Sequence, residues 1–400
     1  MNHPAQRDPQ TAHWPLIMIG VLALAVTMGV GRFAFTPLLP LMLRDGTFTP
    51  STGAEWAAAN YLGYLVGALT ASRFSKHPKF GLVLSLLGIT ITTAAIALVT
   101  SSPSSLLLGA GLRFLSGICS AWTMVCASTW CLGELAKRNA ANLGAWMFTG
   151  VGTGIVLAGL LTWLGGHQTA ASLWLELGLL ALVGTAIVWI GVARSRQTVS
   201  ATATAANKIG SSAASVTEQS QTGIVFCYGA FGFGYIIQAT FLPAMARQQI
   251  SDPMVFGLTW PIFGLAAALS VCVCAYWLKG WSRRRVWAIA QFAMAFGTML
   301  PIFTQQIGAL ALSAIFVGGT FMVTTMAGLQ LARDMTPANP MPLLAKMTMA
   351  FALGQIAGPI FVRLIGEDGF AGLDAVIVAN AVATVLLIAT AAWLWRQPSK

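Results

Sequence analysis

The sequence predicts an all-α membrane protein with twelve transmembrane helices in two pseudo-symmetric six-helix bundles. Three observations lead to this prediction: the composition, the number of long apolar runs, and an internal repeat. Of 400 residues, 56% are hydrophobic and only 8% are charged, whereas ordinary soluble domains carry roughly 25% charged residues. This composition excludes a soluble enzyme with a single buried helix.

The apolar residues fall into twelve runs, most of them about as long as the 20 or so residues that cross a bilayer as a helix. Lipid offers the backbone no hydrogen bonds, so each run is expected to be helical. The connections are mostly short, which predicts antiparallel neighbours. The runs cover residues 14–43, 51–74, 80–100, 105–131, 141–165, 170–194, 222–246, 254–279, 286–306, 308–332, 341–365 and 370–395.

A repeat links the two halves of the chain. The stretch GVGRFAFTPLLP at 29–40 recurs in altered form as GFGYIIQATFLP at 232–243. Six positions match at one fixed offset of 203 residues. They pair Gly29 with Gly232, Gly31 with Gly234, Leu39 with Leu242, Pro40 with Pro243, Met42 with Met245 and Arg44 with Arg247. The chain therefore reads as two copies of one membrane unit.

The boundary between the copies is expected at a low-complexity segment rich in Ser, Thr and Ala, residues 195–221. Such a composition is typical of a flexible linker. We predict an N-terminal six-helix bundle at 1–194 and a C-terminal six-helix bundle at 222–400. Two parallel repeats of this kind are an arrangement found in transporters.

The basic residues predict the orientation. With the N-terminus inside, cytoplasmic segments hold sixteen of the 22 Lys and Arg residues, outer loops hold Arg44, Arg247 and Arg363, and three lie inside spans. Positive charge collects on the cytoplasmic side of membrane proteins. We therefore expect a multi-pass protein of the cell inner membrane with both termini cytoplasmic.

Other classes of function find little support. The basic residues lie between apolar runs, as they do beside a membrane, so the net charge of +11 does not indicate nucleic acid. The six cysteines show no metal-site or disulfide spacing. No phosphate loop and no nucleophile–base pair stand out. We predict no cofactor, no metal and no enzymatic activity. A non-transporting membrane sensor stays open as an alternative, although the linker is too short and too polar to be an output domain.

Several motifs carry a resemblance to a known family. Arg113 to Ala121 reads Arg-x-x-x-Gly-x-x-x-Ala, and Gly150, Gly152, Gly154 and Gly159 form a loose glycine-rich motif. Together with the architecture, these resemble the major facilitator superfamily across the whole chain. The segment from Gly67 to Arg73 lacks the aspartate of the superfamily's usual loop signature, which puts its gating salt bridge in doubt. GVGRFAFTPLLP, with Gly354, Gln355, Gly358 and Pro359, resembles the poorly characterised YbfB/YjiJ-type branch. The resemblance implies transport by alternating access, a central site near the midplane, and a monomer.

Arg32 is the principal candidate for binding substrate. An arginine at mid-span costs about 2.5–3.5 kcal/mol on insertion scales, so it should face the interior or a wet cavity. Its guanidinium matches a carboxylate or phosphate, although pairing within the bundle would explain it almost as well. Its repeat equivalent is Tyr235, and Gln238 lies one turn further on the same face, at the position equivalent to Phe35. We include Phe35, Tyr235, Gln238 and Gln355 among the substrate-binding candidates.

Arg113 joins this set, with a role in proton coupling or conformational locking favoured over substrate contact, because its motif occurs in transporters of very different substrates. Acidic residues are scarce. Glu55, Glu176 and Asp374 are the three expected within spans, near their outer ends. They are the candidates for proton coupling, and Glu55 or Glu176 is a candidate partner of Arg32 or Arg113.

Buried cations without obvious buried acids favour a particular substrate. We predict a secondary active transporter of a small organic solute, with an organic anion as the preferred class, in a lipid bilayer and driven by a proton or solute gradient. The alternative is a proton-coupled exporter of neutral hydrophobic compounds, in which Arg32 would be held in a salt bridge.

Overall fold

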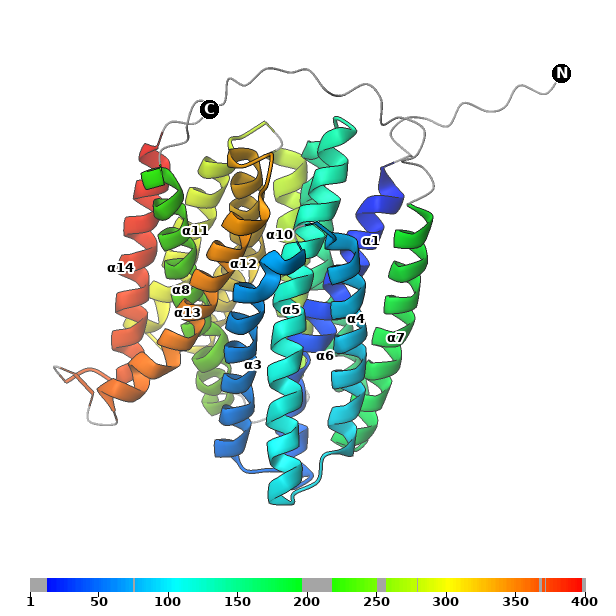
Figure 1. The fold of residues 1–400 in the computed structure, drawn as a ribbon. Coiled ribbons are helices and arrows are strands. Elements are labelled where there is room, and N and C mark those ends of the chain that lie inside the picture. The colour runs from blue at the N-terminus through cyan, green and yellow to red at the C-terminus, as the bar shows by residue number, and fades with distance from the viewer. Residues whose placement is uncertain are drawn as a thin grey trace.

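The computed structural model describes residues 13–74, 76–195, 218–249, 257–278, 280–366, 369–370 and 372–397. Within these residues the chain crosses the molecule as twelve long helical segments (Figure 1). α1 begins and α14 ends on the same side of the molecule, which we call the terminal face. Most of the predicted linker, residues 196–217, lies outside the described residues, and its last four residues, 218–221, are already helical. The predicted domain limits stay a prediction.

The first six crossings follow the predicted runs closely. The first consists of α1 (Trp14–Leu24), the π-helix η1 (Ala25–Phe33) and α2 (Phe35–Arg44). The next five are α3 (Pro50–Thr70) with the 3₁₀ turn η2 (Ala71–Phe74), α4 (Pro78–Ala95) with η3 (Ile96–Leu98), α5 (Pro103–Lys137), η4 (Ala141–Phe148) with α6 (Thr149–Leu164), and α7 (Ala170–Arg194).

The last six crossings are α8 (Glu218–Gln249), α10 (Thr259–Trp277), α11 (Arg283–Phe303), α12 (Ile307–Met335), α13 (Met341–Ile365) and α14 (Ala375–Arg396). One prediction near their outer ends is wrong. Asp374 does not lie within the last span, because the helix begins at Ala375 and the Asp374 carboxylate caps it, accepting a hydrogen bond of 2.8 Å from the backbone N–H of Val376.

Eleven of the described crossings are long and apolar enough to span a membrane. The exception is α3, whose apolar character is lowered by Glu55, Asn60, Tyr61 and Tyr64. α3 nevertheless packs beside α5 and α13 inside the molecule. Its polar and aromatic side chains become important at the site described below.

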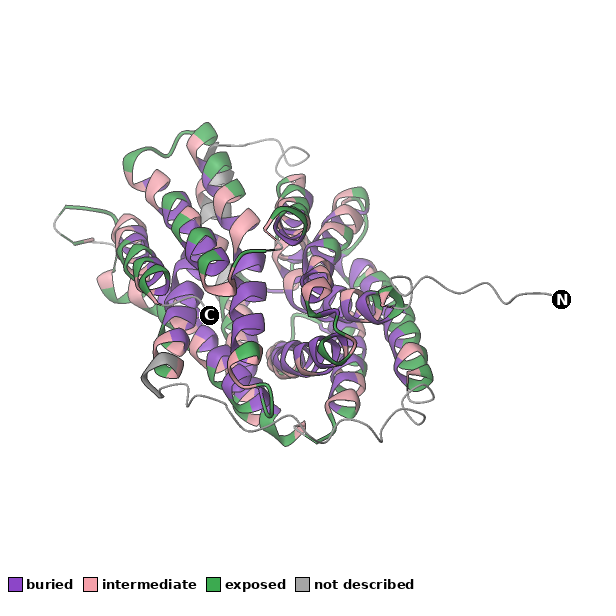
Figure 2. Ribbon diagram, turned by 90° about the horizontal axis from the view of Figure 1, so that it is seen from above, coloured by how far each residue is buried: buried purple, intermediate pink, exposed green. Residues whose placement is uncertain are grey.

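The outer surface of the helices is apolar. Figure 2 shows buried residues facing the interior and exposed residues on the outward faces of the helices. Large hydrophobic side chains such as Ile91, Leu179 and Trp189 are more than 60% exposed. In contrast, Asn60, Gln291 and Gln355 are nearly fully buried. An apolar exterior around buried polar groups is what a lipid environment requires.

Glycines bring the same pair of helices together in each bundle. In the first, a Cβ on Gly29 would lie 2.2 Å from the Cα of Gly154, so η1 and α6 touch through their backbones. In the second, a Cβ on Gly354 would lie 2.2 Å from the carbonyl oxygen of Gly229, which brings α13 against α8. Small residues at helix contacts allow this approach. The first crossing thus contacts the fifth, and the seventh contacts the eleventh in the same way. These equivalent contacts reflect the internal repeat.

Gly117, in the Arg113 motif, offers a test of this packing. A Cβ there would lie 2.2 Å from the carbonyl oxygen of Asn60, whereas a Cβ on Gly111 of the same helix would meet nothing within 4 Å. We expect Gly117→Ala to destabilise the protein by about 2–3 kcal/mol through overpacking. Gly111→Ala, the matched control, should change stability by less than about 1 kcal/mol, in the stabilising direction. Thermal unfolding of both variants in detergent measures this, and equal midpoints would show that α3 and α5 can separate at no cost.

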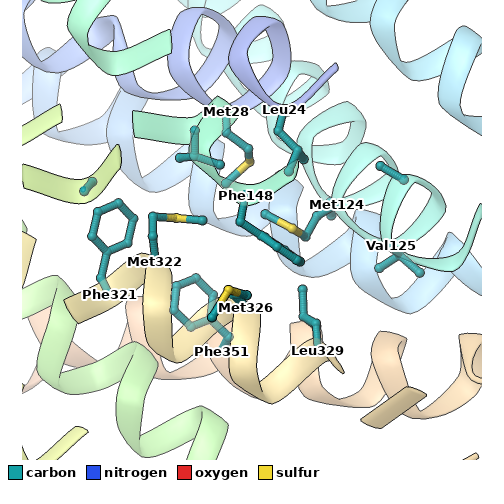
Figure 3. Close-up of a cluster of buried hydrophobic side chains, with 14 of the residues drawn as sticks. Leu24, Met28, Met124, Val125, Phe148, Phe321, Met322, Met326, Leu329 and Phe351 are labelled. Carbon is teal, nitrogen blue, oxygen red and sulfur yellow. The ribbon is translucent and has the colours of Figure 1, made fainter. Parts of the chain in front are cut away.

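The two bundles meet along two helix pairs and through an apolar cluster. α6 packs on α10, and α3 packs on α13. Figure 3 shows side chains of both bundles facing one another. All are buried: Leu24, Met28, Met124, Val125 and Phe148 from the first, and Phe321, Met322, Met326, Leu329 and Phe351 from the second. Leu24 and Met28 precede Arg32 along the first crossing, so most of this cluster lies between Arg32 and the terminal face.

On the opposite side, Arg44 and Asp45 tie two loops of the first bundle together. Arg44 donates hydrogen bonds to the carbonyl oxygens of Gly166 and Gln168, and its Nε lies 2.8 Å from an Asp45 oxygen. The other Asp45 oxygen accepts from the backbone N–H of Ala170, at the start of α7. Burial alone raises the pKa of Asp45, but the hydrogen bonds from Arg44 and Ala170 outweigh it and hold this pKa below its ordinary value of 3.8.

This lowered pKa predicts a pH dependence. The Asp45 carboxylate stabilises the fold above its unfolded-state pKa, and the contribution disappears as the pH falls through the lower folded-state pKa. Asp45→Asn should lower the free energy of unfolding by about 1 kcal/mol at pH 7, because one charge-assisted contact is weakened. Unfolding midpoints of the variant and the parent protein should converge below about pH 4. A difference that widens under acid would contradict this reading.

Candidate functional site

Arg32 lies at the end of η1, in the interior of the molecule, and is 3% exposed. Its Nη2 donates a hydrogen bond of 2.5 Å to Oε1 of Gln355 on α13. Its guanidinium carbon lies 3.9 Å from the centre of the Tyr64 ring on α3. A residue of the first bundle is thus bonded to one of the second, at the seam where substrate is expected between the bundles.

The charge of Arg32 is only partly compensated. Nε and Nη1 are buried and make no hydrogen bond within the described residues. The contacts it does make are with a neutral amide and with aromatic rings, including Tyr61 at 5.9 Å and Phe33 at 5.7 Å. A cation over a ring is worth about 2 kcal/mol when desolvated, less than a carboxylate partner would supply. The site therefore presents two donor nitrogens without a partner among the described residues, and a positive charge with no ion pair there.

The break in the first crossing explains how Arg32 is positioned. In a π-helix the carbonyl of residue i accepts from the N–H of residue i+5, so the donor for the Arg32 carbonyl would be Pro37, which has no N–H. Arg113 fills this gap, because its Nη2 donates to the carbonyl oxygen of Arg32 at 3.2 Å and its Nη1 to that of Gly31 at 3.0 Å. The α register resumes where Leu38 bonds to Ala34.

Both Nη atoms of Arg113 are therefore bound to backbone, while its Nε is buried without a hydrogen-bond partner among the described residues. It is 2% exposed and lies 4.6 Å over the ring of Phe35. Ser116, one turn along α5, adds a second hydrogen bond to the Gly31 carbonyl, and Asn60 on α3 donates to the carbonyl of Arg113 itself. The locking role considered for Arg113 fits these contacts. Phe35 packs on Arg113 and on Trp56.

Tyr235, the repeat equivalent of Arg32, lies close enough to interact with it electrostatically. It is 1% exposed, and its hydroxyl makes no hydrogen bond among the described residues. Its ring stacks between Phe321 on α12, at 5.0 Å, and Phe351 on α13, at 6.2 Å. Tyr235 thus contributes a second unsatisfied donor beside the cation.

Gln238 belongs to a different network. Its Nε2 donates to Oδ1 of Asn380 at 2.5 Å, and its Oε1 accepts from Ser313 at 3.2 Å. These bonds join α8, α14 and α12 inside the second bundle. No contact with Arg32 is found for Gln238 among the described residues, so its place in a substrate site stays a prediction.

The three acidic candidates lie away from both arginines. Glu55 and Glu176 are exposed, and Asp374 caps α14. The ion pairs found within the described ranges join Arg44 to Asp45, and Glu134 to Lys137 and Arg138. The suggested pairing of Glu55 or Glu176 with Arg32 or Arg113 is therefore absent from this structure. Their role in proton coupling stays a prediction.

Several residues of the site were not predicted from the sequence: Asn60, Tyr61, Tyr64, Phe321 and Phe351. Asn60 could have been found from the sequence, because an amide inside a membrane span is unusual. Tyr64 lies one turn further along the same helix face, so it could have been found from Asn60. The phenylalanines carried no signal, since aromatic residues in apolar runs are usual packing material.

A family model described as "Uncharacterised MFS-type transporter YbfB" matches residues 24–393. The chain belongs to this family. The YbfB family is a family of major facilitator transporters, so the resemblance inferred from GVGRFAFTPLLP and the Gln355 segment is confirmed. No curated protein matches the chain.

A solved structure shares the fold of this YbfB-family protein. The crystal structure of the human organic anion transporter MFSD10 (TETRAN) superposes with a TM-score of 0.68 at 13% sequence identity, covering 98% of this chain and 100% of that one. The predicted major facilitator fold is confirmed. At this identity the likeness concerns the fold alone.

Proposed function

We propose that the protein is a secondary transporter that carries a small organic anion across the inner membrane by alternating access, with both termini cytoplasmic. The observation that carries the proposal is the incompletely paired Arg32. Its guanidinium is buried between the bundles and bonds to the neutral amide of Gln355, and two of its nitrogens have no hydrogen-bond partner within the described residues. An ionisable group inside a membrane protein marks a substrate or ion pathway by default.

Other cations of the interior do not compete for this role. Arg113 donates from both Nη atoms to backbone carbonyls and keeps only Nε without a partner among the described residues. Arg333, towards the end of α12 at the terminal face, donates to the carbonyl oxygen of Thr129 on α5. A carboxylate, by contrast, could accept two parallel hydrogen bonds from Arg32, the geometry that guanidinium groups favour. MFSD10, described as an organic anion transporter, has the same fold.

The competing candidate is an exporter of neutral hydrophobic compounds, favoured by the aromatic rings around Arg32. Inhibition of uptake into proteoliposomes separates the two. We expect carboxylates to compete with a labelled substrate acid, while their amides and lipophilic cations do not. Competition by amides as strong as that by the acids would favour the hydrophobic exporter.

The same uptake assay tests whether the protein couples transport of the anion to protons. Uptake of an anion driven by protons should rise when the outside is made acidic and collapse when a protonophore is added. Glu55, Glu176 and Asp374 are the side chains to replace by amides if it does.

A further inference from the structure

Aromatic rings form a continuous ladder through the second bundle and reach Arg32. Trp260 and Phe263 stack at 5.3 Å and 10°, Phe263 and Phe321 at 5.5 Å and 19°. The ladder continues from Phe321 to Tyr235 at 5.0 Å and 22°, and from Tyr235 to Phe351 at 6.2 Å and 25°. We call these five residues the ring ladder. Its members come from α8, α10, α12 and α13.

The two rings that flank Tyr235 in the ladder also contact the rings around Arg32. Phe351 meets Tyr64 edge-to-face at 6.3 Å, and Tyr64 lies under the guanidinium at 3.9 Å. Phe321 meets Phe33 edge-to-face at 6.3 Å, and Phe33 lies 5.7 Å from the same guanidinium. Among the described residues, Arg32, Tyr235 and Trp260 of this aromatic group carry buried hydrogen-bond donors without a partner. Trp260 lies at the end of the ladder that is furthest along it from Arg32, so Arg32 and Tyr235 are the two donors considered for a ligand.

Phe321 is stacked with Phe263 and Tyr235 inside the second bundle, whereas its contact with Phe33, and that of Phe351 with Tyr64, join the two bundles. When the bundles separate, a flat ring of a substrate can take the place of Phe33 or Tyr64 against these phenylalanines, because aromatic pairs are favoured at centroid distances of about 4.5–7 Å. We propose that the transported anion is an aromatic carboxylate, held with its acid group on Arg32 and the Tyr235 hydroxyl and with its ring against Phe321 or Phe351. This rests on the proposed function and narrows its substrate class.

The proposal assigns separate tasks to separate side chains. Arg32 supplies charge, through Nε and Nη1, and recognises any carboxylate. The Tyr235 hydroxyl donates to one carboxylate oxygen. Phe321 and Phe351 select for a flat ring over a saturated one of the same size. Separation of the bundles during opening would free Arg32 from Gln355, since these two residues belong to different bundles.

The test compares matched acids on the purified full-length protein. Isothermal titration in detergent measures the affinity of benzoate and 2-naphthoate against their fully saturated counterparts. Each pair has the same charge and carbon number. We expect the aromatic acids to bind about 10-fold or more tightly, since stacking on one or two rings provides a preference of that order. In Phe321→Leu, which keeps the apolar volume and removes the ring, the preference should fall below about 3-fold.

Phe226→Leu is the matched control, because Phe226 is 62% exposed on α8 and lies outside the ladder. It should keep the full preference. Tyr235→Phe tests the second donor without changing the stacking, and should weaken all acids about 5-fold or more while the aromatic preference stays. This variant keeps the proposal open to test even if Phe321→Leu fails to fold.

The outcomes separate the two proposals. Equal binding of aromatic and saturated acids, lost for both in Arg32→Gln, would overturn the aromatic specificity and leave the anion transporter standing. Binding that does not depend on Arg32, or that is shared by uncharged benzamide, would overturn both.

Discussion

Replacing Arg32 by glutamine is expected to reduce uptake of the substrate anion by about 100-fold or more while the empty protein stays folded. Removing one partner of a buried charge pair costs about 2–5 kcal/mol in binding, or about 30- to 5,000-fold, and a loss of about 100-fold lies within this range. Within the described part of the chain, the empty protein loses the hydrogen bond to Gln355 and the ring contacts, and it is relieved of an incompletely paired buried charge. Its unfolding midpoint should therefore stay within a few degrees of the parent protein or rise.

Arg363→Gln is the matched control, because it makes the same substitution at an exposed position of α13. It should retain full uptake. Arg32→Lys should keep part of the activity, since the charge remains but the planar fork is lost. Uptake that survives in Arg32→Gln would make this arginine structural, and a large drop in its midpoint would point the same way.

Replacing Arg113 by alanine should have a different effect: it should lower the stability of the folded protein and not the affinity for substrate alone. Arg113 satisfies the Arg32 and Gly31 carbonyls at the break before Pro37. Hydrogen bonds from a charged group contribute about 1.5–3 kcal/mol each. A buried carbonyl left without a donor costs additional free energy, because it has been removed from water with nothing to replace the lost hydrogen bond. We expect destabilisation of about 3 kcal/mol or more, measured as a lower unfolding midpoint and reduced yield of monodisperse protein.

Ser116→Ala is the graded control for this second prediction. It removes one hydrogen bond to the Gly31 carbonyl, which Arg113 still serves, so the cost should be near 1 kcal/mol. An Arg113→Ala protein as stable as Ser116→Ala, with substrate affinity lost, would instead place Arg113 in contact with the substrate.

The helices were predictable because lipid leaves a chain few choices. Uninterrupted apolar runs must become helices, and the limits of α7 and α13 agree with the predicted runs residue by residue. Arg32 was predictable for a related reason: an arginine in such a run needs a special explanation. Its contact with Gln355 joins two residues 323 positions apart, and both had been selected as candidates.

What the sequence did not reveal depends on tertiary distance. The length of the last helix could not be read exactly, because an apolar run does not distinguish the cap Asp374 from the helix that it caps. The role of Arg113 depends on the Arg32 carbonyl, which Pro37 leaves without a donor in another helix. The ring ladder is built from four helices, and each aromatic residue by itself looks like ordinary packing.

The most direct measurement is a thermodynamic cycle of four affinities, in which the charge of the ligand and the charge of Arg32 are removed separately and together. The affinities of one aromatic carboxylate and of its uncharged amide are determined by titration calorimetry on the parent protein and on Arg32→Gln. If the anion sits on Arg32, the acid should bind at least about 30-fold more tightly than the amide in the parent protein, and this advantage should disappear in the variant, a coupling of about 2 kcal/mol. An advantage of the acid that is unchanged in Arg32→Gln would contradict the central claim and place the anion elsewhere.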